Sequence, residues 1–363
     1  MKPVSNNEQL KEIVIEGYKS IGHCHLEIGS LNVLIGANGA GKSNFISFLR
    51  LIAILLDHQL QPLVGRAGGP DMLLHYGRKY TERLKAELYF GNNGYKFELE
   101  PTLDNRMMFY REALWWEKNG DNSICSGHFE SQVDQLHSGV TQYTIPIMRK
   151  WRVYHFHDTS DSAKVKQIHR IYDNDYLRED GANLAAFLFR LQQHHIKHYT
   201  RIVKTIQMVA PFFGDFYLRP TPGNSDFIQL EWMEQGQSIP FKANELSDGT
   251  LRFILLTTVM LQPKDYMPSA IIIDEPELGL HPYAINVLGE LIKSVSYQFQ
   301  VILSTQSVEL VNQFDAEDLI VVDKHQGAST FIRLDEEKLS EWLEDFSLGE
   351  LWKKNLLGGR PQA

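Results

Sequence analysis

The sequence has few cysteines and no long uninterrupted apolar run. It contains two cysteines, Cys24 and Cys125, too few for a disulfide framework or a cysteine-based zinc site. We therefore expect free, buried thiols in a reducing compartment. The most apolar stretch, residues 45–56, is interrupted by Arg50 and is shorter than a membrane-spanning helix. Since no secretory signal is visible near Met1 either, we expect a soluble, cytoplasmic protein.

The chain also lacks an excess of positive charge. Its 45 acidic residues against 36 lysines and arginines give a formal net charge of −9, which argues against a surface that is basic all round. A local patch can still contact nucleic-acid phosphates. For each basic cluster, however, an ordinary solvated surface is the simpler interpretation, because no helix-turn-helix, zinc finger or RNA-binding motif accompanies it. The candidates are Arg78, Lys79, Arg83 and Lys85; Arg149, Lys150 and Arg152; and His194, His195, Lys197, His198, Arg201 and Lys204.

No apolar heptad pattern, internal repeat or low-complexity tract interrupts the chain, so long coiled coils are not expected. A length of 363 residues exceeds the size of most single cores. We expect an α/β fold with a mixed sheet, an antiparallel β subdomain and a compact helical second lobe. The predicted divisions are 1–60, the first part of the main domain; 61–218, an inserted lobe of hairpins and helices; and 219–363, the rest of the main domain.

Residues 36–43 match a P-loop, and they follow the apolar run 31–35 and precede a helical pattern from Asn44. Glycines let backbone N–H groups point inward at phosphates, and the start of a helix adds its dipole. Lys42 supplies an ammonium for the phosphates, and the Ser43 hydroxyl can ligate Mg²⁺. The predicted nucleotide-binding residues are Gly36, Ala37, Asn38, Gly39, Ala40, Gly41, Lys42, Ser43 and Asn44.

A second motif follows the apolar run 270–273, which is typical of a buried strand. Asp274 and Glu275 lie where this strand ends, at the edge where open α/β sheets bind ligands. We interpret the segment as a Walker B motif, in which Asp274 holds Mg²⁺ and Glu275 orients or deprotonates the attacking water. A strand ending in solvated acids is the simpler alternative.

Residues 246–250, Leu-Ser-Asp-Gly-Thr, open a further helix, and alone they predict only a helix N-cap. Between the two preceding motifs, the segment resembles the signature motif of ABC-type ATPases, which reads Leu-Ser-Gly-Gly-Gln in transporters. The resemblance implies that Ser247, Asp248 and Gly249 contact ATP bound to the P-loop of another subunit. Hydrolysis then requires a homodimer or a higher homo-oligomer.

Other segments resemble the same class. Residues 13–20 are similar to the opening strand of RecF, SMC and OLD-type ATPase heads, with Tyr18 where a phenylalanine is usual. Residues 278–282 resemble the D-loop, and segments 348–352 and 358–361 resemble the tail, of stand-alone predicted ATPases of this class. Several of these relatives act in DNA repair or antiphage defence. OLD-type proteins append a TOPRIM nuclease domain, for which the residues after Val322 are too few.

One departure from the usual ABC pattern concerns the switch position after the strand 301–303, where most members have a histidine and this chain has Gln306. An amide can donate a hydrogen bond to a phosphate or hold water, but it does not exchange a proton near neutral pH. We therefore place Gln306 with Lys42 and Glu275 as candidate catalytic residues. An ordinary polar loop residue is the alternative.

Between the P-loop and the signature, alternation predicts a hairpin from residues 84–90 to 95–99, and a second through residues 118–121. Residues 65–70 are predicted to be a loop, 182–207 to be helical and 219–224 to be a linker. His155 and His157 share a face if they lie on a strand, but no companion cluster completes a metal shell, so a metal site there is disfavoured.

The sequence thus predicts a Mg²⁺-dependent ATPase that dimerises around ATP and controls DNA or an effector protein such as a nuclease, with no membrane partner. Two alternatives stay open. The first is a nucleotide-gated sensor or scaffold with little turnover, which Gln306 favours. The second is a transporter ATPase subunit, which the non-transporter signature and the long inserted segment disfavour.

Overall fold

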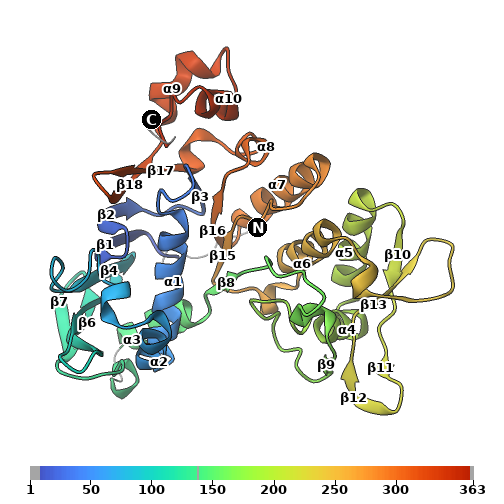
Figure 1. Ribbon diagram of the computed structural model, residues 1–363, viewed down its shortest axis with the longest axis horizontal. Coiled ribbons are helices and arrows are strands. Elements are labelled where there is room, and N and C mark those ends of the chain that lie inside the picture. Colours follow the sequence, from blue (N-terminus) through green and yellow to red (C-terminus); the bar gives the residue numbers. More distant parts are fainter. Residues whose placement is uncertain (1–8, 137–138, 360–363) are drawn as a thin grey trace. The chain divides into compact units, whose positions relative to one another are not determined.

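The computed structural model describes residues 9–136 and 139–359, and the chain divides into two units (Figure 1). The first unit comprises Met1–Val153, Ser269–Asp274 and Ser296–Ala363. The second comprises Tyr154–Pro268 and Glu275–Val295. The predicted divisions after residues 60 and 218 remain a prediction.

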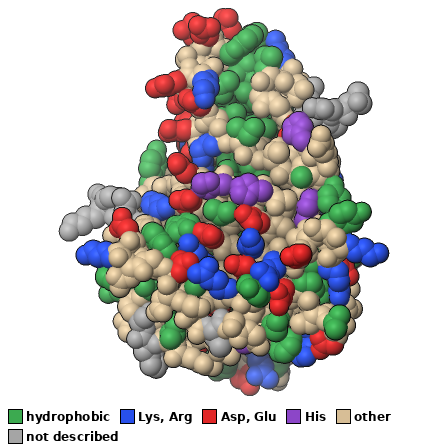
Figure 2. All heavy atoms as spheres, turned by 90° about the vertical axis from the view of Figure 1, so that its left-hand side faces the viewer, with side chains coloured by type: hydrophobic (Ala, Val, Ile, Leu, Met, Phe, Trp, Pro, Cys, Tyr) green, Lys and Arg blue, Asp and Glu red, His purple; other side chains and the backbone are tan. Residues whose placement is uncertain are grey.

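An antiparallel sheet forms one layer of the first unit, in the order β2-β1-β4-β5-β6-β7. Its strands alternate between buried and solvated side chains because one face covers the core. The solvated face carries cross-strand ion pairs, such as Lys85 with Glu16 at 3.4 Å, and Figure 2 shows acidic, basic and histidine side chains interspersed on this side. The strands are β1 (Glu12–Tyr18), β2 (Ile21–Glu27), β4 (Leu84–Phe90), β5 (Asn93–Pro101), β6 (Met107–Trp116) and β7 (Gly120–Cys125).

A mixed sheet forms the other layer, in the order β18-β17-β3-β16-β15-β8. β17, β3, β16 and β15 run parallel, and β18 is antiparallel to β17. The central strands are almost entirely buried, as expected for a parallel sheet covered on both faces. The strands are β3 (Leu31–Ile35), β8 (Arg152–Tyr154), β15 (Ala270–Asp274), β16 (Gln300–Thr305), β17 (Leu319–His325) and β18 (Ala328–Arg333).

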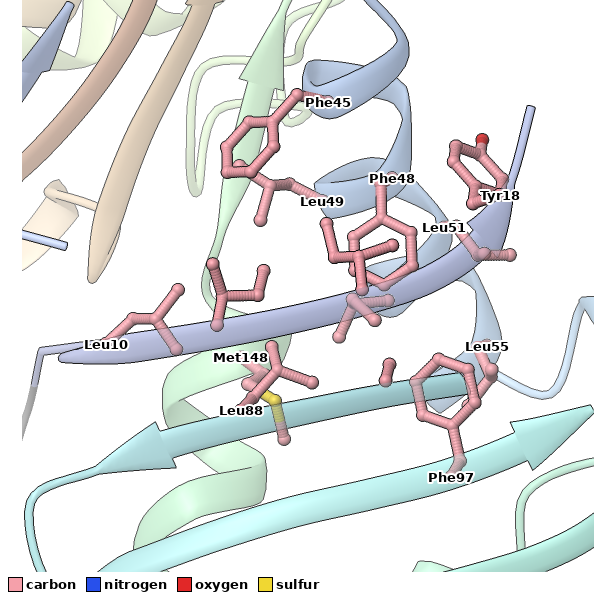
Figure 3. Close-up of a cluster of buried hydrophobic side chains, with 14 of the residues drawn as sticks. Leu10, Tyr18, Phe45, Phe48, Leu49, Leu51, Leu55, Leu88, Phe97 and Met148 are labelled. Carbon is pink, nitrogen blue, oxygen red and sulfur yellow. The ribbon is translucent and has the colours of Figure 1, made fainter. Parts of the chain in front are cut away.

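The helix α1 (Lys42–Leu56) is buried on two faces because it contributes to a core shared with both sheets. Figure 3 shows Phe45, Phe48 and Leu55 of α1 among side chains such as Leu88 of β4 and Phe97 of β5. The same buried cluster includes Ile272, Ile302 and Ile320 of the mixed sheet. The first unit also contains α2 (Leu60–Ala67), α3 (Gly139–Arg149), α8 (Val308–Val311), α9 (Glu336–Leu343), α10 (Leu348–Lys353) and the 3₁₀ turns Pro70–Met72, Val133–Gln135 and Ala316–Asp318.

The second unit is mainly helical, with two small antiparallel sheets. Its helices are α4 (Leu184–His194), α5 (Ile196–Val209), α6 (Asp248–Leu261) and α7 (Pro282–Ser296), with 3₁₀ turns at Lys164–Lys166, Ala243–Glu245 and Lys264–Tyr266. The small sheets contain β9 (His169–Arg170), β10 (Phe213–Phe216), β11 (Pro220–Thr221), β12 (Asn224–Ile228), β13 (Glu231–Glu234) and β14 (Phe241–Lys242). Within the described residues no helix exceeds 15 residues, so the expected absence of long coiled coils holds there.

The predicted α/β fold, mixed sheet, antiparallel subdomain and helical lobe are confirmed. Both predicted hairpins form, as β4–β5 and β6–β7. No helix of the described residues is long and apolar enough to cross a bilayer. Cys24 is free and buried as expected. The side chain of Cys125 is not among the side chains that the structure describes.

Several local predictions were wrong. Residues 65–67 belong to α2 rather than to a loop, and this helix ends at Gly68 with a φ of 94°. Residues 219–224 are not a linker: β11 and β12 pair across a turn at Gly223, whose φ is 83°. The helical stretch 182–207 is two helices, because His195 leaves the helical conformation. His155 and His157 lie after β8 rather than on a strand.

Candidate nucleotide-binding site

The carboxyl ends of the central strands bring three predicted segments of the first unit to one edge. Ile35 of β3 pairs with Thr305 of β16, so Gly36 and Gln306 follow paired residues. On the next strand, Asp274 of β15 pairs with Ser304. The P-loop, the first Walker B carboxylate and the switch position therefore meet where parallel sheets bind ligands.

The P-loop packs so closely against neighbouring strands that its first and third glycines have no room for a side chain. A Cβ on Gly36 would lie 2.1 Å from the carbonyl O of Val322, and one on Gly41 would lie 2.1 Å from the Ser329 Oγ. The loop leads into α1, whose first turn has no side-chain cap and no acidic residue. Its N-terminal amides thus form the kind of site that binds anions.

Lys42 is buried, and its ammonium lies against the loop itself. The Nζ atom donates hydrogen bonds to the carbonyl O of Gly36 at 2.8 Å and of Ala37 at 3.1 Å. A buried ammonium needs such partners because desolvation penalises its charge. The ammonium of Lys42 therefore lies inside the curve of the loop.

A hydroxyl network that the sequence did not reveal supports the loop from the β1–β2 turn and from β18. The Ser329 Oγ donates to the carbonyl O of Ala40 at 2.5 Å and lies 2.7 Å from the Ser20 Oγ, with which it shares a hydrogen bond. Asn44, on the first turn of α1, donates through Nδ2 to the Ser20 Oγ at 2.7 Å. Tyr18 and Lys19 each contact the Ser47 Oγ, at 3.0 and 3.1 Å. The segment 18–20 thus fixes the start of α1.

Burial around this segment shifts two titratable groups. The pKa of the Tyr18 phenol is raised to about 12, because burial disfavours the phenolate more than the Ser47 hydrogen bond favours it. Burial lowers the pKa of Lys19. The phenol of Tyr18 is therefore a neutral structural anchor for α1 throughout the physiological pH range.

The predicted metal ligands lie together. The Ser43 Oγ is 3.4 Å from the Asp274 Oδ1. The Ser304 Oγ of the neighbouring strand donates a hydrogen bond to the same carboxylate oxygen. A hydroxyl and a carboxylate are the hard oxygen donors that Mg²⁺ prefers, so this pair fits the ion that a P-loop requires.

Gln306 is half-buried directly after β16. Ser307 then caps α8, since its Oγ accepts a hydrogen bond from the N–H of Leu310 at 3.2 Å. Residue 306 thus lies between a buried strand and a capped helix. It directly follows Thr305, which pairs with Ile35. The backbone of residue 306 therefore lies at the same edge of the sheet as the start of the P-loop.

Glu275 follows Asp274 in the chain and groups with the second unit. Its φ is 47°, in the left-handed region that glutamate rarely adopts. Backbone strain of this kind is concentrated at functional sites. The observation supports a special role for Glu275, although its role as the catalytic base remains a prediction.

In the second unit, residues 246–250 form the start of α6. Ser247 is the N-cap, because its Oγ accepts a hydrogen bond from the N–H of Thr250 at 3.2 Å. Ser247 and Asp248 are exposed, whereas Leu246 is buried. A Cβ on Gly249 would lie 2.4 Å from the carbonyl O of Gly279, so the signature segment packs directly on the segment predicted to be the D-loop.

Arg252 of α6 links these elements, a role that no sequence pattern predicts. Its Nη1 donates to the carbonyl O of Leu278 at 2.8 Å. Its Nε and Nη2 donate to the carbonyl O atoms of Phe156 at 3.0 Å and His157 at 2.8 Å. One guanidinium therefore ties the signature helix to the D-loop and to the chain after β8, through five donors in a fixed plane.

The fold and the P-loop edge are those of a P-loop nucleotide-binding domain, and the fold is similar to that of SMC heads. The chain belongs to the AAA_21 family, whose model is described as "AAA domain, putative AbiEii toxin, Type IV TA system" and matches residues 31–312. The predicted resemblance to this class is confirmed. No curated protein matches the sequence.

Solved structures of SMC heads share the fold. An SmcHead bound to the C-winged helix domain of ScpA has a TM-score of 0.61 and 16% identity, with 92% of this chain and 99% of that chain covered. A Pyrococcus furiosus Smc head with an extended coiled coil, bound to the C-terminal domain of ScpA, has a TM-score of 0.60 and 15% identity, covering 93% and 98%. A Pyrococcus yayanosii Smc head with a coiled coil and joint has a TM-score of 0.54 and 13% identity, covering 93% and 99%.

Proposed function

We propose that this protein is a Mg²⁺-dependent ATPase that associates with a second copy of itself around ATP. The single observation that carries the proposal is the convergence of Lys42, Ser43 and Asp274 at the edge of the parallel strands. Lys42 and the loop amides bind the phosphates, while Ser43 and Asp274 hold the metal ion. The bound ion neutralises phosphate charge.

Two further groups complete the proposed reaction. Glu275 accepts a proton from the attacking water or orients it, and Gln306 positions that water or donates to a phosphate oxygen. Ser247 and Gly249, with Asp248 beside them, reach the nucleotide on the neighbouring subunit. The exposure of Ser247 and Asp248 in the single chain supports this, because a group that meets a partner has to be accessible.

Association around ATP provides a switch: because ATP binds more tightly to the associated form, it shifts the population toward it. We propose that this switch acts in antiphage defence or DNA repair, by controlling DNA or an effector protein. The description of the family names a toxin of a type IV toxin–antitoxin system, which favours defence.

The substitution Glu275→Gln tests the proposal. It keeps the size of the side chain but removes the base, so phosphate release at saturating Mg-ATP falls by about 10²–10⁴-fold. Light scattering in the same conditions then reports a stable dimer. Glu277→Gln, the same change two residues further on, is the matched control and keeps the parental rate. A parental rate in Glu275→Gln, or a monomer with hydrolysis blocked, contradicts the proposal.

A specific observation favours DNA as the partner. Lys197, Arg201 and Lys204 are exposed at spacings of four and three residues, which places them on one side of α5. Among the described residues, no acidic side chain forms an ion pair with any of them. The other two predicted clusters are partly neutralised, since Arg83 pairs with Glu100 at 3.1 Å and Arg149 with Asp134 at 2.6 Å.

Reversing the three charges of α5 to glutamate tests this surface. We expect duplex DNA binding to weaken. The plot of log K against log salt concentration should become less steep by about two to three units, since each phosphate contact contributes about 0.9 to its slope. A control variant reverses Lys118, Lys264 and Lys324, three other exposed lysines, and so has the same net charge. Equal losses in the two variants, or none in either, exclude α5 as the DNA surface.

A further inference from the structure

The C-terminal part of the described chain lies against the P-loop. After α10 the chain reaches Gly358 and Gly359, which have φ angles of 82° and 79°. The carbonyl O of Gly359 accepts a hydrogen bond from the N–H of Ala37 at 2.6 Å. This contact joins the first turn of the nucleotide loop to a segment outside residues 31–312, the part of the chain that the family model matches.

The contact leaves little room for a side chain at position 359. A Cβ on Gly359 would lie 3.3 Å from the Cα of Gly36 and 3.1 Å from the Cγ1 of Val321, both tighter than ordinary contacts. A Cβ on Gly358 would lie 3.8 Å from the same Cγ1, an ordinary distance. The two glycines therefore share a backbone conformation but differ in their clearance from the loop.

A short helix anchors this segment to the element that follows the switch position. The N–H of Gly349 donates to the Asn312 Oδ1 at 2.7 Å, and Leu351 and Trp352 of α10 are buried. A Cβ on Gly349 would lie 2.5 Å from the Cγ1 of Val308, so α10 packs tightly on α8. Since α8 begins two residues after Gln306, residues 347–359 connect the exit of β16 to the start of the P-loop.

We propose that Gly359 is a positioning residue for nucleotide binding. Its carbonyl oxygen holds Ala37, and the loop therefore keeps its curved form before ATP arrives. A loop that is ordered in advance loses less conformational entropy on binding, so the contact increases the affinity for ATP rather than the rate of the chemical step. This inference rests on the proposed nucleotide site.

The test compares Gly359→Ala with Gly358→Ala. Both variants place alanine at a positive φ, so both carry the same kind of backbone cost. Only Gly359→Ala crowds the loop. We expect its dissociation constant for Mg-ATP and its KM to rise about tenfold, which corresponds to about 1.4 kcal/mol. Its kcat stays at the parental value, and the Ala37 amide exchanges hydrogen faster in the absence of nucleotide. Gly358→Ala stays close to the parental values in all of these measurements.

A second variant guards against a folding defect. A chain shortened to end at Leu357 keeps α10 and removes the Gly359 carbonyl, so it shows the same rise in KM with the parental melting temperature. Parental affinity and exchange in Gly359→Ala, or an equal effect in Gly358→Ala, overturns the inference. If the parental protein binds Mg-ATP no better than Lys42→Ala does, the nucleotide site itself is wrong and the inference falls with it. If the tail variants bind Mg-ATP like the parental protein while Lys42→Ala binds it less tightly, the inference about Gly359 is wrong and the nucleotide site stands.

Discussion

The P-loop and the signature segment each begin a helix, but they are held in different ways. In the first unit, Lys42, Ser329 and Gly359 all make hydrogen bonds to loop backbone. In the second unit, the exposed Ser247 hydroxyl contacts Thr250 of its own helix. The first helix start is fixed by distant parts of the chain, whereas the second is fixed by local capping and by the packing of Gly249 on Gly279.

This difference shows which part of the proposed site is formed before ATP arrives. A loop that surrounds phosphates gains affinity from being ordered in advance. A segment that contacts a nucleotide on another molecule needs accessible groups on a rigid support. Arg252 supplies that support, because it ties the signature helix to the carbonyl O atoms of Phe156 and Leu278. Substitutions in the two segments should therefore affect different measurements.

The largest expected effects on binding, about 100-fold each, come from one substitution in each segment, and the first is in the P-loop. Lys42→Ala removes the ammonium from the P-loop and with it the two hydrogen bonds to the Gly36 and Ala37 carbonyls. We expect ATP affinity to fall by about 100-fold, because a hydrogen bond from a charged group contributes about 1.5–3 kcal/mol. Isothermal titration calorimetry measures this change. Lys42→Arg retains the charge and serves as the control, and an unchanged affinity in Lys42→Ala would show that the lysine does not face the phosphates.

Ser247→Asp should separate association from binding. Aspartate is as good an N-cap as serine, so the melting temperature stays the same. Its negative charge repels the phosphates of a neighbour's ATP, and we expect ATP-dependent dimerisation to weaken by about 100-fold. Nucleotide binding by the monomer is unaffected. Ser247→Thr retains the hydroxyl and should dimerise normally. A dimer of parental stability in Ser247→Asp contradicts the role of the signature segment.

The smallest expected effect is a dependence of the melting temperature on pH. The same measurement tests whether the two units melt separately. Burial, with Asp315 and Glu317 nearby, raises the pKa of Asp318 to about 6. The neutral form therefore favours the folded state, and this stabilisation is complete below the unfolded pKa of 3.8 and is lost as the pH rises through about 6. Asp318→Asn should raise the melting temperature of the first unit slightly at pH 7.5 and leave it unchanged at pH 3.5. Calorimetry at the two pH values checks this, and a shift in a transition of the second unit would show that the units melt together.

Local patterns predicted the parts of the fold that local physics determines. The hairpin from β4 to β5 was predictable because Leu84, Ala86 and Leu88 alternate and Gly91 follows the strand. The P-loop was predictable because its glycines, Lys42 and Ser43 lie within eight residues between a strand and a helix. The turn at Pro222 and Gly223 is not distinguishable from a linker in the sequence, because the same residues suit a loop and a tight hairpin equally well.

The supports of the site were not predictable, since each joins residues far apart in the chain. Ser329 and Ser20 are separated by 309 positions, and Gly359 reaches back to Ala37. A serine in a strand or a glycine near a chain end carries no local signal of such a partner. Arg252 was missed for the same reason, because three of its acceptors are backbone carbonyls, which have no identity in the sequence.

The burial of α1 on two faces has a mechanical consequence. Densely packed interiors deform little, and side chains of both sheets interlock with the helix that begins at Lys42. Because α1 is densely packed, it does not shift independently of its neighbours. A displacement of its first turn by a bound phosphate therefore also moves the antiparallel sheet. A change at the nucleotide is therefore expected to reach the strands that share this core, such as β4 and β5.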